Sequence, residues 1–471
     1  MTPEARLASA IDLLNAIAAA PRRPADATAN AFFRERRFIG GGDRRAIAQL
    51  AWNVLRNWRK LHWHFPDRAA EGFSTADVTP RLLCAAMLHF EGMALDDVAR
   101  MFSGERYAPA RLKAPEKLAL SHLAGKKLAM PQQSNAVRLE YPDWLAPALE
   151  AQFGPDLVPE MAAMGQAPTL DLRANLLKGT REEALRELAR AGLTAKPTTL
   201  SPWGLRLEGR QPVTASQPFR DGLVEIQDEG SQLVAAAAAP KPGQRVADFC
   251  AGAAGKTLAM AMLMENRGQI VACDVSEPRL EGAAKRLKRA GVHNATRHLL
   301  TAGDKWAKRR EGTFDVVLVD APCSGTGTWR RNPDARLRLR QQDLDELVPK
   351  QAAILQRAAK LVRPGGRLVY ATCSLLDAEN GQQVAAFLQS HPDFALAAEG
   401  ETSSLLPEGL RGKGAFSLTP YRDGTDGFFA ATMVRKAAPT STEAPLAGPA
   451  EGSQALRAPD QPGEGAPASA A

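Results

Sequence analysis

The second half of the sequence predicts an α/β fold, a mostly parallel sheet covered by helices on both faces. From about Gly243, short apolar runs alternate with helical runs, and the run Phe314–Val319 is apolar throughout, as in a strand buried on both faces. Polar residues follow the strand ends, where ligands of such sheets bind. The predicted strands are 245–249, 269–273, 296–300, 314–319, 367–372 and 427–434, and the predicted helices are 256–266, 277–290, 343–362 and 378–390.

The first half of the chain divides into two regions with different patterns. In residues 1–130 apolar side chains recur at helical spacing, which predicts an all-helical domain. Residues 135–235 mix the two patterns, with strands expected at 170–175 and 204–207 and a helix at 182–191, so we expect a small α+β domain. Residues 236–436 hold the α/β pattern. The tail at 437–471 is rich in Ala, Pro, Gly, Ser and Glu and is expected to be disordered.

Composition limits the partners of the chain. The net charge of +8 favours a polyanionic partner, although a solvated basic surface explains it equally well. The chain has no apolar run of about 18 residues or more, so no membrane span is expected. The five cysteines include no CxxC pair, and we expect no metal, a reducing cytoplasmic location and a monomer.

A turn of small residues joins the first strand of the α/β region to its helix. It runs from Cys250 through Ala251, Gly252, Ala253, Ala254 and Gly255 to Lys256. Small residues let the backbone approach a ligand, and the start of a helix offers free N–H groups. Asp274 ends the next strand, where an acid can hold ribose hydroxyls. Asp304 follows the third strand, where contacts with an adenine edge are common in adenosyl-cofactor folds.

Two nucleotide-binding alternatives compete for this turn. Ala254–Thr257 resembles the end of a phosphate-binding P-loop, but that motif requires glycine at the position of Cys250. A dinucleotide site is also weakly supported, because no complete GxGxxG is present. The acid after the second strand and the turn at 364–366 fit S-adenosylmethionine better.

Two cysteines, Cys323 and Cys373, lie in polar turns after predicted strands. A thiolate that adds to C6 of cytosine makes C5 nucleophilic enough to attack a methyl sulfonium, which is covalent catalysis. Cys373, Asp320 and Cys323 can supply the thiolate, a group near N3 and N4, and help in release, while Lys256, Arg330 and Arg331 are candidates to lower a thiol pKa. Either cysteine alone is more simply a small packing residue. Their two sequence contexts together favour catalysis.

At these residues the chain resembles the RsmB/Sun/Nop family of RNA (cytosine-5) methyltransferases. The segments that carry the resemblance are 320–334, 370–374, 425–430 and 227–232. The resemblance covers residues 135–436. It implies a Rossmann-like methyltransferase domain with a mostly parallel seven-stranded sheet, and residues 1–130 resemble the NusB-like RNA-binding domain of some members. A protein-docking role for these helices remains an alternative.

The family's roles map onto matching positions of this chain. The resemblance implies Cys373 as the nucleophile, release assisted by Cys323, and S-adenosylmethionine as the cofactor. DNA cytosine methyltransferases attack with the Pro-Cys cysteine, so Cys323 is the rival nucleophile. The family turn usually reads Cys-Ala-Ala-Pro-Gly-Gly-Lys, and here the proline and one glycine are missing. The implied catalytic residues are Cys373, Cys323, Asp320 and Lys256, and the implied cofactor contacts are Cys250, Ala251, Gly252, Ala253, Ala254, Gly255, Lys256, Asp274, Asp304 and Asp320.

The sequence therefore predicts an S-adenosylmethionine-dependent RNA 5-methylcytosine methyltransferase, with 16S ribosomal RNA as the expected substrate by family analogy. The target base is expected to be flipped or single-stranded. Candidate RNA contacts are the basic segments 279–289, 305–310 and 330–340. The alternatives are a methyltransferase that acts on transfer RNA or a non-RNA substrate, and a non-catalytic ribosome assembly factor.

Overall fold

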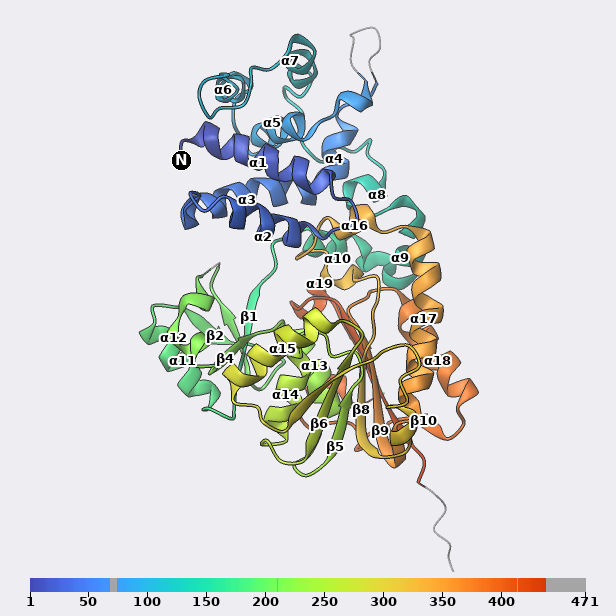
Figure 1. Ribbon diagram of the computed structural model, residues 1–471. Coiled ribbons are helices and arrows are strands. Elements are labelled where there is room, and N and C mark those ends of the chain that lie inside the picture. Colours follow the sequence, from blue (N-terminus) through green and yellow to red (C-terminus); the bar gives the residue numbers. More distant parts are fainter. Residues whose placement is uncertain (68–73, 210, 413, 438–471) are drawn as a thin grey trace, which may run out of the picture. The chain divides into compact units, whose positions relative to one another are not determined.

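The computed structural model describes residues 1–67, 74–209, 211–412 and 414–437 (Figure 1). Residues Met1–Lys436 form one compact unit. The predicted disordered tail lies, from residue 438 onward, outside the described residues.

The main sheet has the order β10-β12-β9-β8-β5-β6-β7, with β11 paired to β12. The neighbouring strands β7, β6, β5, β8 and β9 are parallel to one another, and β12 is antiparallel to β9. The predicted mostly parallel sheet is therefore confirmed, with β10 and β11 as additional strands that the sequence did not indicate. The strands are β5 (Arg245–Asp248), β6 (Gln269–Asp274), β7 (Ala295–Leu299), β8 (Phe314–Asp320), β9 (Val362–Thr372), β10 (Phe394–Leu396), β11 (Ala415–Leu418) and β12 (Phe428–Arg435).

Alternation along β8 gives the sheet two apolar faces. Val316 and Leu318 pack with residues of α13 and α14, whereas Val317 and Val319 pack with residues of α17 and α18. This period of two, in a strand buried on both faces, explains why the sequence of β8 is apolar throughout. The helices of this part are α13 (Glu229–Ala238), α14 (Gly255–Leu263), α15 (Glu277–Ala290), α16 (Ala335–Arg338), α17 (Gln341–Ala359), α18 (Gly381–Ser390) and α19 (Pro420–Asp423).

Several element boundaries differ from the prediction: α17 spans Gln341–Ala359 rather than 343–362, and α18 begins at Gly381 rather than at residue 378. Two further differences, at α14 and β9, have a clear backbone cause. Helix α14 ends at Leu263 rather than at residue 266, because Glu265 and Asn266 take left-handed φ angles of 51° and 58°. Strand β9 begins at Val362, since the turn at 364–366, which was expected to precede the strand, is a register shift within it.

The N-terminal region is helical, as predicted, and its buried side chains form a core of their own. Its likeness to NusB stays a prediction. The helices are α1 (Pro3–Ala18), α2 (Ala25–Glu35), α3 (Gly41–Arg56), α4 (Trp58–Trp63), α5 (Pro80–Phe90), α6 (Leu95–Met101) and α7 (Ala114–Ser121), followed by α8 (Asn135–Arg138), α9 (Ala146–Phe153) and α10 (Leu157–Met164).

A small antiparallel sheet of order β2-β3-β1-β4 precedes the main sheet. The predicted strands at 170–175 and 204–207 are present as β1 and β3, and the predicted helix is α11. The division of the chain into domains at the predicted boundaries stays a prediction. The elements are β1 (Leu170–Ala174), α11 (Arg181–Arg190), β2 (Ala195–Pro197), β3 (Gly204–Leu207), α12 (Gln217–Arg220) and β4 (Val224–Ile226).

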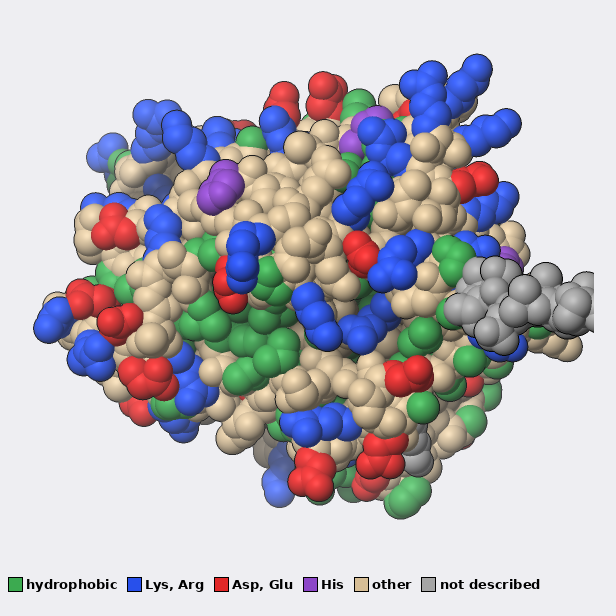
Figure 2. Space-filling model, turned by 90° about the horizontal axis from the view of Figure 1, so that it is seen from below, with side chains coloured by type: hydrophobic (Ala, Val, Ile, Leu, Met, Phe, Trp, Pro, Cys, Tyr) green, Lys and Arg blue, Asp and Glu red, His purple; other side chains and the backbone are tan. Residues whose placement is uncertain are grey.

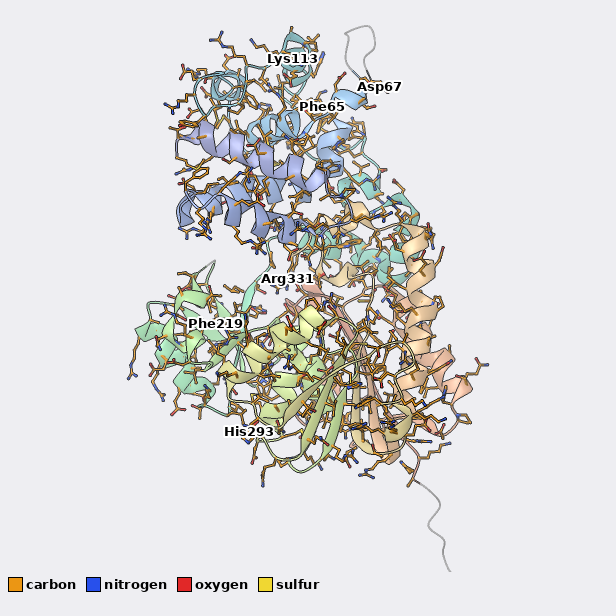
Figure 3. The ribbon with its side chains drawn as sticks, viewed as in Figure 1. Phe65, Asp67, Lys113, Phe219, His293 and Arg331 are labelled. Carbon is orange, nitrogen blue, oxygen red and sulfur yellow. The ribbon has the colours of Figure 1, made fainter. Side chains whose placement is uncertain are left out.

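The N-terminal helices contact the segment that follows Cys323. Trp52 Nε1 donates to the carbonyl of Arg331 at 3.4 Å, and the N–H of Ala25 donates to Asp334 Oδ2 at 3.1 Å. Figure 3 shows Arg331 between the N-terminal helices and the two sheets. These contacts hold the segment 331–334 against the N-terminal helices.

The surface carries many basic side chains. On the face shown in Figure 2, Lys and Arg side chains lie across much of the molecule, beside an apolar area. Within the described ranges, no helix has the length and apolar character needed to span a membrane.

Candidate functional site

The predicted site residues gather at the carboxyl edge of the main sheet. Asp248, Asp274 and Asp320 end β5, β6 and β8, and β9 ends at Thr372, directly before Cys373. Because these strands are parallel and adjacent, their ends meet at one edge of the sheet.

The small-residue turn 250–254 is held mainly by backbone hydrogen bonds. The N–H of Ala251 donates to the carbonyl of Cys273 at 2.9 Å, and the N–H of Gly252 donates to Asp274 Oδ2 at 2.8 Å. Gly252 and Ala254 both have positive φ, and Ala254 is left-handed immediately before α14. This turn lacks the proline and one glycine that are usual in the family. Its backbone nevertheless lies close to Asp274.

Lys256 is paired rather than free. Its Nζ donates to Asp320 Oδ2 at 2.6 Å. Burial alone would lower the pKa of Lys256, but the adjacent Asp320 carboxylate and its hydrogen bond raise it. A thiolate at Cys373 also raises the pKa of Lys256, so the nucleophile candidate lies within electrostatic reach of the ammonium.

Carboxylates surround the turn and argue against the P-loop alternative. Burial, followed by the charges of Asp320, Asp248 and Asp274, raises the pKa of the Cys250 thiol. A triphosphate placed here would face these acids, while the only lysine of the turn is already paired with one of them. The same acids suit a ligand that carries a positive charge and ribose hydroxyls.

Asp248 and Asp304 differ from the other acids of the site. Asp248 Oδ2 accepts from Thr257 Oγ1 at 2.6 Å, but among the described residues its buried Oδ1 has no partner, and burial raises its pKa to about 7. Asp304 accepts from His298 Nε2 at 2.5 Å and from the N–H of Trp306 at 2.7 Å, and the His298 bond lowers the pKa of Asp304. In the described chain its hydrogen bonds go to these neighbours and not to the other predicted site residues.

The two cysteines face each other. Cys323 Sγ and Cys373 Sγ lie 3.4 Å apart, both partly exposed, and within the described residues neither is in a disulfide. The hydrogen bond with Cys373 is the largest of the effects that raise the pKa of Cys323, followed by burial and by the charges of Cys373 and Glu379. The structure therefore brings together Cys323 with Cys373, and Lys256 with Asp320.

Comparison with known proteins agrees with this geometry. The family model described as "16S rRNA methyltransferase RsmB/F" matches residues 235–434, and a model of the RsmF/B-like ferredoxin-like domain matches residues 141–214. "Ribosomal RNA small subunit methyltransferase B" of Citrobacter koseri is 34% identical over 414 residues, which cover 84% of this chain and 92% of that protein. The chain belongs to the RsmB/F family.

Two further comparisons support this membership. "Probable ribosomal RNA small subunit methyltransferase B" of Synechocystis is 36% identical over 304 residues, or 62% of this chain and 66% of that protein. The crystal structure of PH0851 has a TM-score of 0.71 at 25% identity, covering 92% of this chain and 99% of that one. As a member of the RsmB/F family, the chain is an RNA methyltransferase.

The arginines that follow Cys323 have partners within the protein. Arg330 and Arg331 both form ion pairs with Asp228 and Asp426, and Arg330 is buried, whereas the Arg331 side chain is 29% exposed. Arg336 is also buried and donates to backbone carbonyls. The predictions that Arg330 and Arg331 lower a thiol pKa and that the segment 330–340 contacts RNA stay predictions.

One buried carboxylate next to the cysteines was missed by sequence reasoning. Glu379 is fully buried and accepts hydrogen bonds from Ser324 and Ser374, the residues that follow the two cysteines. Its position six residues after Cys373, at the start of a predicted helix, was the available signal, but an acid at a helix start is ordinarily a cap.

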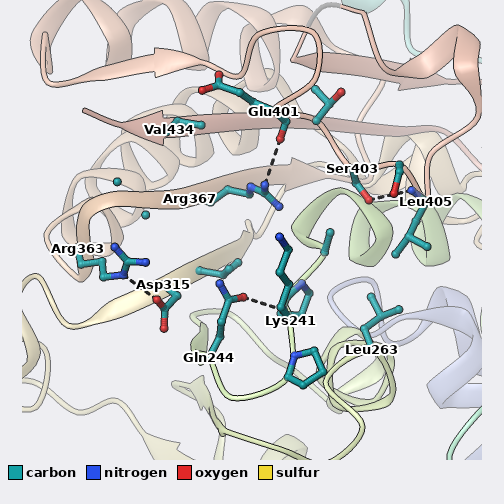
Figure 4. A pocket seen from close by; sticks show the side chains of 18 of the residues that line it. Lys241, Gln244, Leu263, Asp315, Arg363, Arg367, Glu401, Ser403, Leu405 and Val434 are labelled. Carbon is teal, nitrogen blue, oxygen red and sulfur yellow. Dashed lines mark hydrogen bonds and ion pairs between the residues drawn. The ribbon is translucent and has the colours of Figure 1, made fainter. Parts of the chain in front are cut away.

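A separate pocket of about 700 Å³ lies away from the cysteines (Figure 4). Arg363 pairs with Asp315 at 2.7 Å, and Arg367 donates to the carbonyl of Glu401 at 3.1 Å. None of the described residues that line this pocket is a predicted site residue.

In the part of the chain that the structure describes, no group of three or more His, Cys, Asp or Glu side chains is placed to hold a metal ion.

Proposed function

We propose that this protein transfers a methyl group from S-adenosylmethionine to C5 of a cytosine in 16S ribosomal RNA, through a covalent bond between Cys373 and C6 that is released with help from Cys323. The observation that carries the proposal is the 3.4 Å separation of the two thiols beside the Lys256–Asp320 pair. One base can contact both sulfur atoms only if the two atoms lie close together, and their separation meets this condition.

The cofactor is S-adenosylmethionine, in keeping with the RsmB/F methyltransferase family. We assign its contacts to the turn 250–256, Asp274, Asp304 and Asp320, where exposed backbone and carboxylates suit ribose hydroxyls and a positive charge. When bound, the cofactor supplies an electrophilic methyl group. The Asp304 carboxylate accepts hydrogen bonds from His298 and Trp306 in this structure. To contact the cofactor, Asp304 would have to exchange at least one of these hydrogen bonds.

The assignment of Cys373 as the nucleophile, with release assisted by Cys323, follows the resemblance to the RsmB/F family. Attack by Cys373 on C6 places electrons at C5 for methylation. The C5 proton then passes to a base, for which Cys323 is the candidate, and elimination of the Cys373 thiolate restores the ring and frees the RNA.

The substrate is proposed from the family rather than from the site. The RsmB/F model and the relatives are named for small-subunit ribosomal RNA, and a ribosomal substrate would place the reaction in the cytoplasm. The basic segments 279–289, 305–310 and 330–340 remain candidate RNA contacts.

Covalent trapping tests the proposal. In Cys323→Ala the reaction is expected to stall after methyl transfer, so RNA remains attached through Cys373. We would purify this variant from cells under denaturing conditions and sequence the attached RNA, with Cys323→Ala/Cys373→Ala as the control. An adduct that disappears in the double variant supports both roles and identifies the substrate.

Methylation by Cys373→Ala provides the second readout. We expect turnover to fall by about 10⁴-fold or more, as for the loss of other enzymatic nucleophiles, while the cofactor still binds. Turnover retained in Cys373→Ala but lost in Cys323→Ala would make Cys323 the nucleophile. Normal RNA binding without methylation by the wild type would instead indicate an assembly factor.

A further inference from the structure

The buried carboxylate of Glu379 lies where the two cysteine turns meet. The residue ends the short 3-10 turn Asp377–Glu379, which precedes α18, and its relative exposure is 0%. Its Oε1 accepts from the N–H of Ser324 at 2.8 Å and from Gln351 Nε2 at 2.9 Å, and its Oε2 accepts from the hydroxyls of Ser324 and Ser374. A fully buried carboxylate with this many donors is held firmly in place.

The two turns share one pattern around this carboxylate. Each cysteine is followed by a serine, Ser324 after Cys323 and Ser374 after Cys373, and both hydroxyls donate to the same oxygen atom. The turns come from the ends of β8 and β9, 50 positions apart in sequence. Glu379 therefore fixes each cysteine through the residue next to it.

Additional contacts join the same two turns but contain no charge. Thr326 Oγ1 accepts from the N–H of Leu375 at 2.8 Å, and the N–H of Gly327 donates to the carbonyl of Cys373 at 3.0 Å. Hydrogen bonds to an ionised acceptor are roughly twice as strong as neutral ones. Glu379 is thus the strongest single link between the turns.

We propose that Glu379 is the positioning residue of this site: it holds the Cys323 and Cys373 thiols at facing distance by binding both Cys-Ser turns with one carboxylate. The importance of Glu379 for catalysis rests on the proposed function. Its role in holding the two thiols together rests on the hydrogen bonds alone. Thiols that must act on one base in succession need placement to within a fraction of an ångström, and a shift of 1 Å can cost about 100-fold in rate.

The charge of Glu379 has a second consequence. It is one of the groups that raise the pKa of Cys323, after the hydrogen bond with Cys373, burial and the charge of Cys373. Removing that charge while keeping the side-chain volume should therefore shift the alkylation profile of Cys323 to lower pH, an effect that loss of packing alone does not produce.

The rate of disulfide formation tests whether the two thiols are held close together. Diamide oxidises two facing thiols to a disulfide and takes up both protons and both electrons as it becomes the hydrazide. The rate, corrected for the thiolate fraction that the alkylation profile gives at the same pH, therefore reports how often the sulfur atoms meet. In Glu379→Gln the charge is lost, and the remaining oxygen can serve only one of the two donor pairs. If it keeps the N–H groups of Ser324 and Gln351, the NH₂ group faces the two serine hydroxyls, which must then accept, so the charge-assisted link between the turns is lost. We expect disulfide formation to slow by about 10-fold.

The matched control is Glu229→Gln. Glu229 is also fully buried at the start of a helix, and it accepts from the N–H groups of Leu200 and Ser201 at 2.6 and 2.8 Å, far along the chain from the cysteines. Its variant should lose comparable stability but keep the wild-type rate of disulfide formation. Equal rates in Glu379→Gln and the wild type, measured under conditions where both are folded, would overturn the inference.

Methylation kinetics link the geometry to function. We expect Glu379→Gln to lower kcat by about 10- to 100-fold with little change in KM for RNA, and Glu379→Asp to recover part of the loss. If Cys373→Ala methylates normally while Glu379→Gln still slows disulfide formation, the proposed function fails and the positioning role stands. If KM rises and kcat stays unchanged in Glu379→Gln, the role in catalysis is overturned.

Discussion

Two buried carboxylates of this site, Asp248 and Glu379, are bonded in opposite ways. Asp248, at the end of β5 in the cofactor half, accepts one hydrogen bond from Thr257, and in the described chain its Oδ1 has no partner. Glu379, in the cysteine half, accepts from Ser324, Ser374 and Gln351. Both side chains have a relative exposure of 0%, so burial alone does not distinguish them.

The difference shows which half of the site relies on side-chain bonding. The cysteine turns are held by side-chain donors that converge on one charge, whereas the cofactor turn is shaped by its backbone and by small residues. Substitutions should therefore have larger effects in the cysteine half, except at Asp248, where an incompletely bonded acid makes stability depend on pH.

The largest expected effect is the pH dependence caused by Asp248. Its pKa is raised from 3.8 to about 7 by burial, so its contribution to stability is complete below about pH 4 and is lost as the pH rises through about 7. In Asp248→Asn this pH dependence should be absent. Between about pH 4 and pH 7, the free energy of unfolding of the wild type should fall by up to roughly 4 kcal/mol relative to that of the variant. Urea unfolding from pH 4 to pH 8 measures it.

The control for this experiment is Asp12→Asn, at an exposed acid of α1. Its unfolding profile should follow that of the wild type. If the profile of Asp248→Asn also runs parallel to the wild type, Asp248 is not protonated in the folded state, and the contrast with Glu379 disappears.

The next effect is expected at Gly327 in the cysteine half. A Cβ at this position would lie 2.2 Å from the carbonyl oxygen of Gly427 and 2.8 Å from that of Cys373, both backbone atoms that cannot move alone. Gly327→Ala should therefore cost about 3 kcal/mol in the free energy of unfolding and slow disulfide formation by diamide. Thermal unfolding checks the first effect, and an unchanged melting temperature would argue against the close approach of these loops.

A smaller loss is expected from Lys256→Met, which keeps the length of the side chain but removes the partner of Asp320. Because the Asp320 side chain is 33% exposed, water can partly solvate the unpaired carboxylate, and we expect about 1–2 kcal/mol. A double-mutant cycle with Asp320→Asn isolates the pair. A coupling near zero would show that the two residues act independently.

The smallest effect is expected at Gly252 in the cofactor turn. Its φ of 54° disfavours a side chain by about 1 kcal/mol, but no atom lies within 4 Å of the Cβ that Gly252→Ala would add. The variant should fold normally and bind S-adenosylmethionine about tenfold more weakly than the wild type, as measured by calorimetry, because the added methyl group lies in the turn that we assign to the cofactor. Unchanged binding would argue against a cofactor contact at Gly252.

The strand positions and the gathering of polar residues at one sheet edge could be predicted from the sequence. An apolar run such as 314–319 fits few structures other than a buried strand. Because the strands are parallel, Asp274, Asp320 and Cys373 lie at the same edge of the sheet. The facing of Cys323 and Cys373 was expected only from their two contexts, because strand order is not readable from a single sequence.

The buried charges could not be predicted. Arg330 and Arg331 have the composition of an RNA-binding segment, and only the fold reveals Asp228 and Asp426 as their partners. Glu379 likewise has the sequence position of a helix cap, and its role depends on serines from two other segments. Long-range pairing of this kind leaves no local pattern in the chain.

The cluster of Asp228, Arg330, Arg331 and Asp426 has a practical consequence for anyone who prepares the catalytic part alone. The RsmB/F family model begins at residue 235, seven positions after Asp228. A fragment cut at that boundary would contain both arginines but only one of the two aspartates, and would leave an uncompensated positive charge beside the segment that follows Cys323. A recombinant catalytic fragment should therefore begin upstream of β1, so that Asp228 and the strand before it are retained.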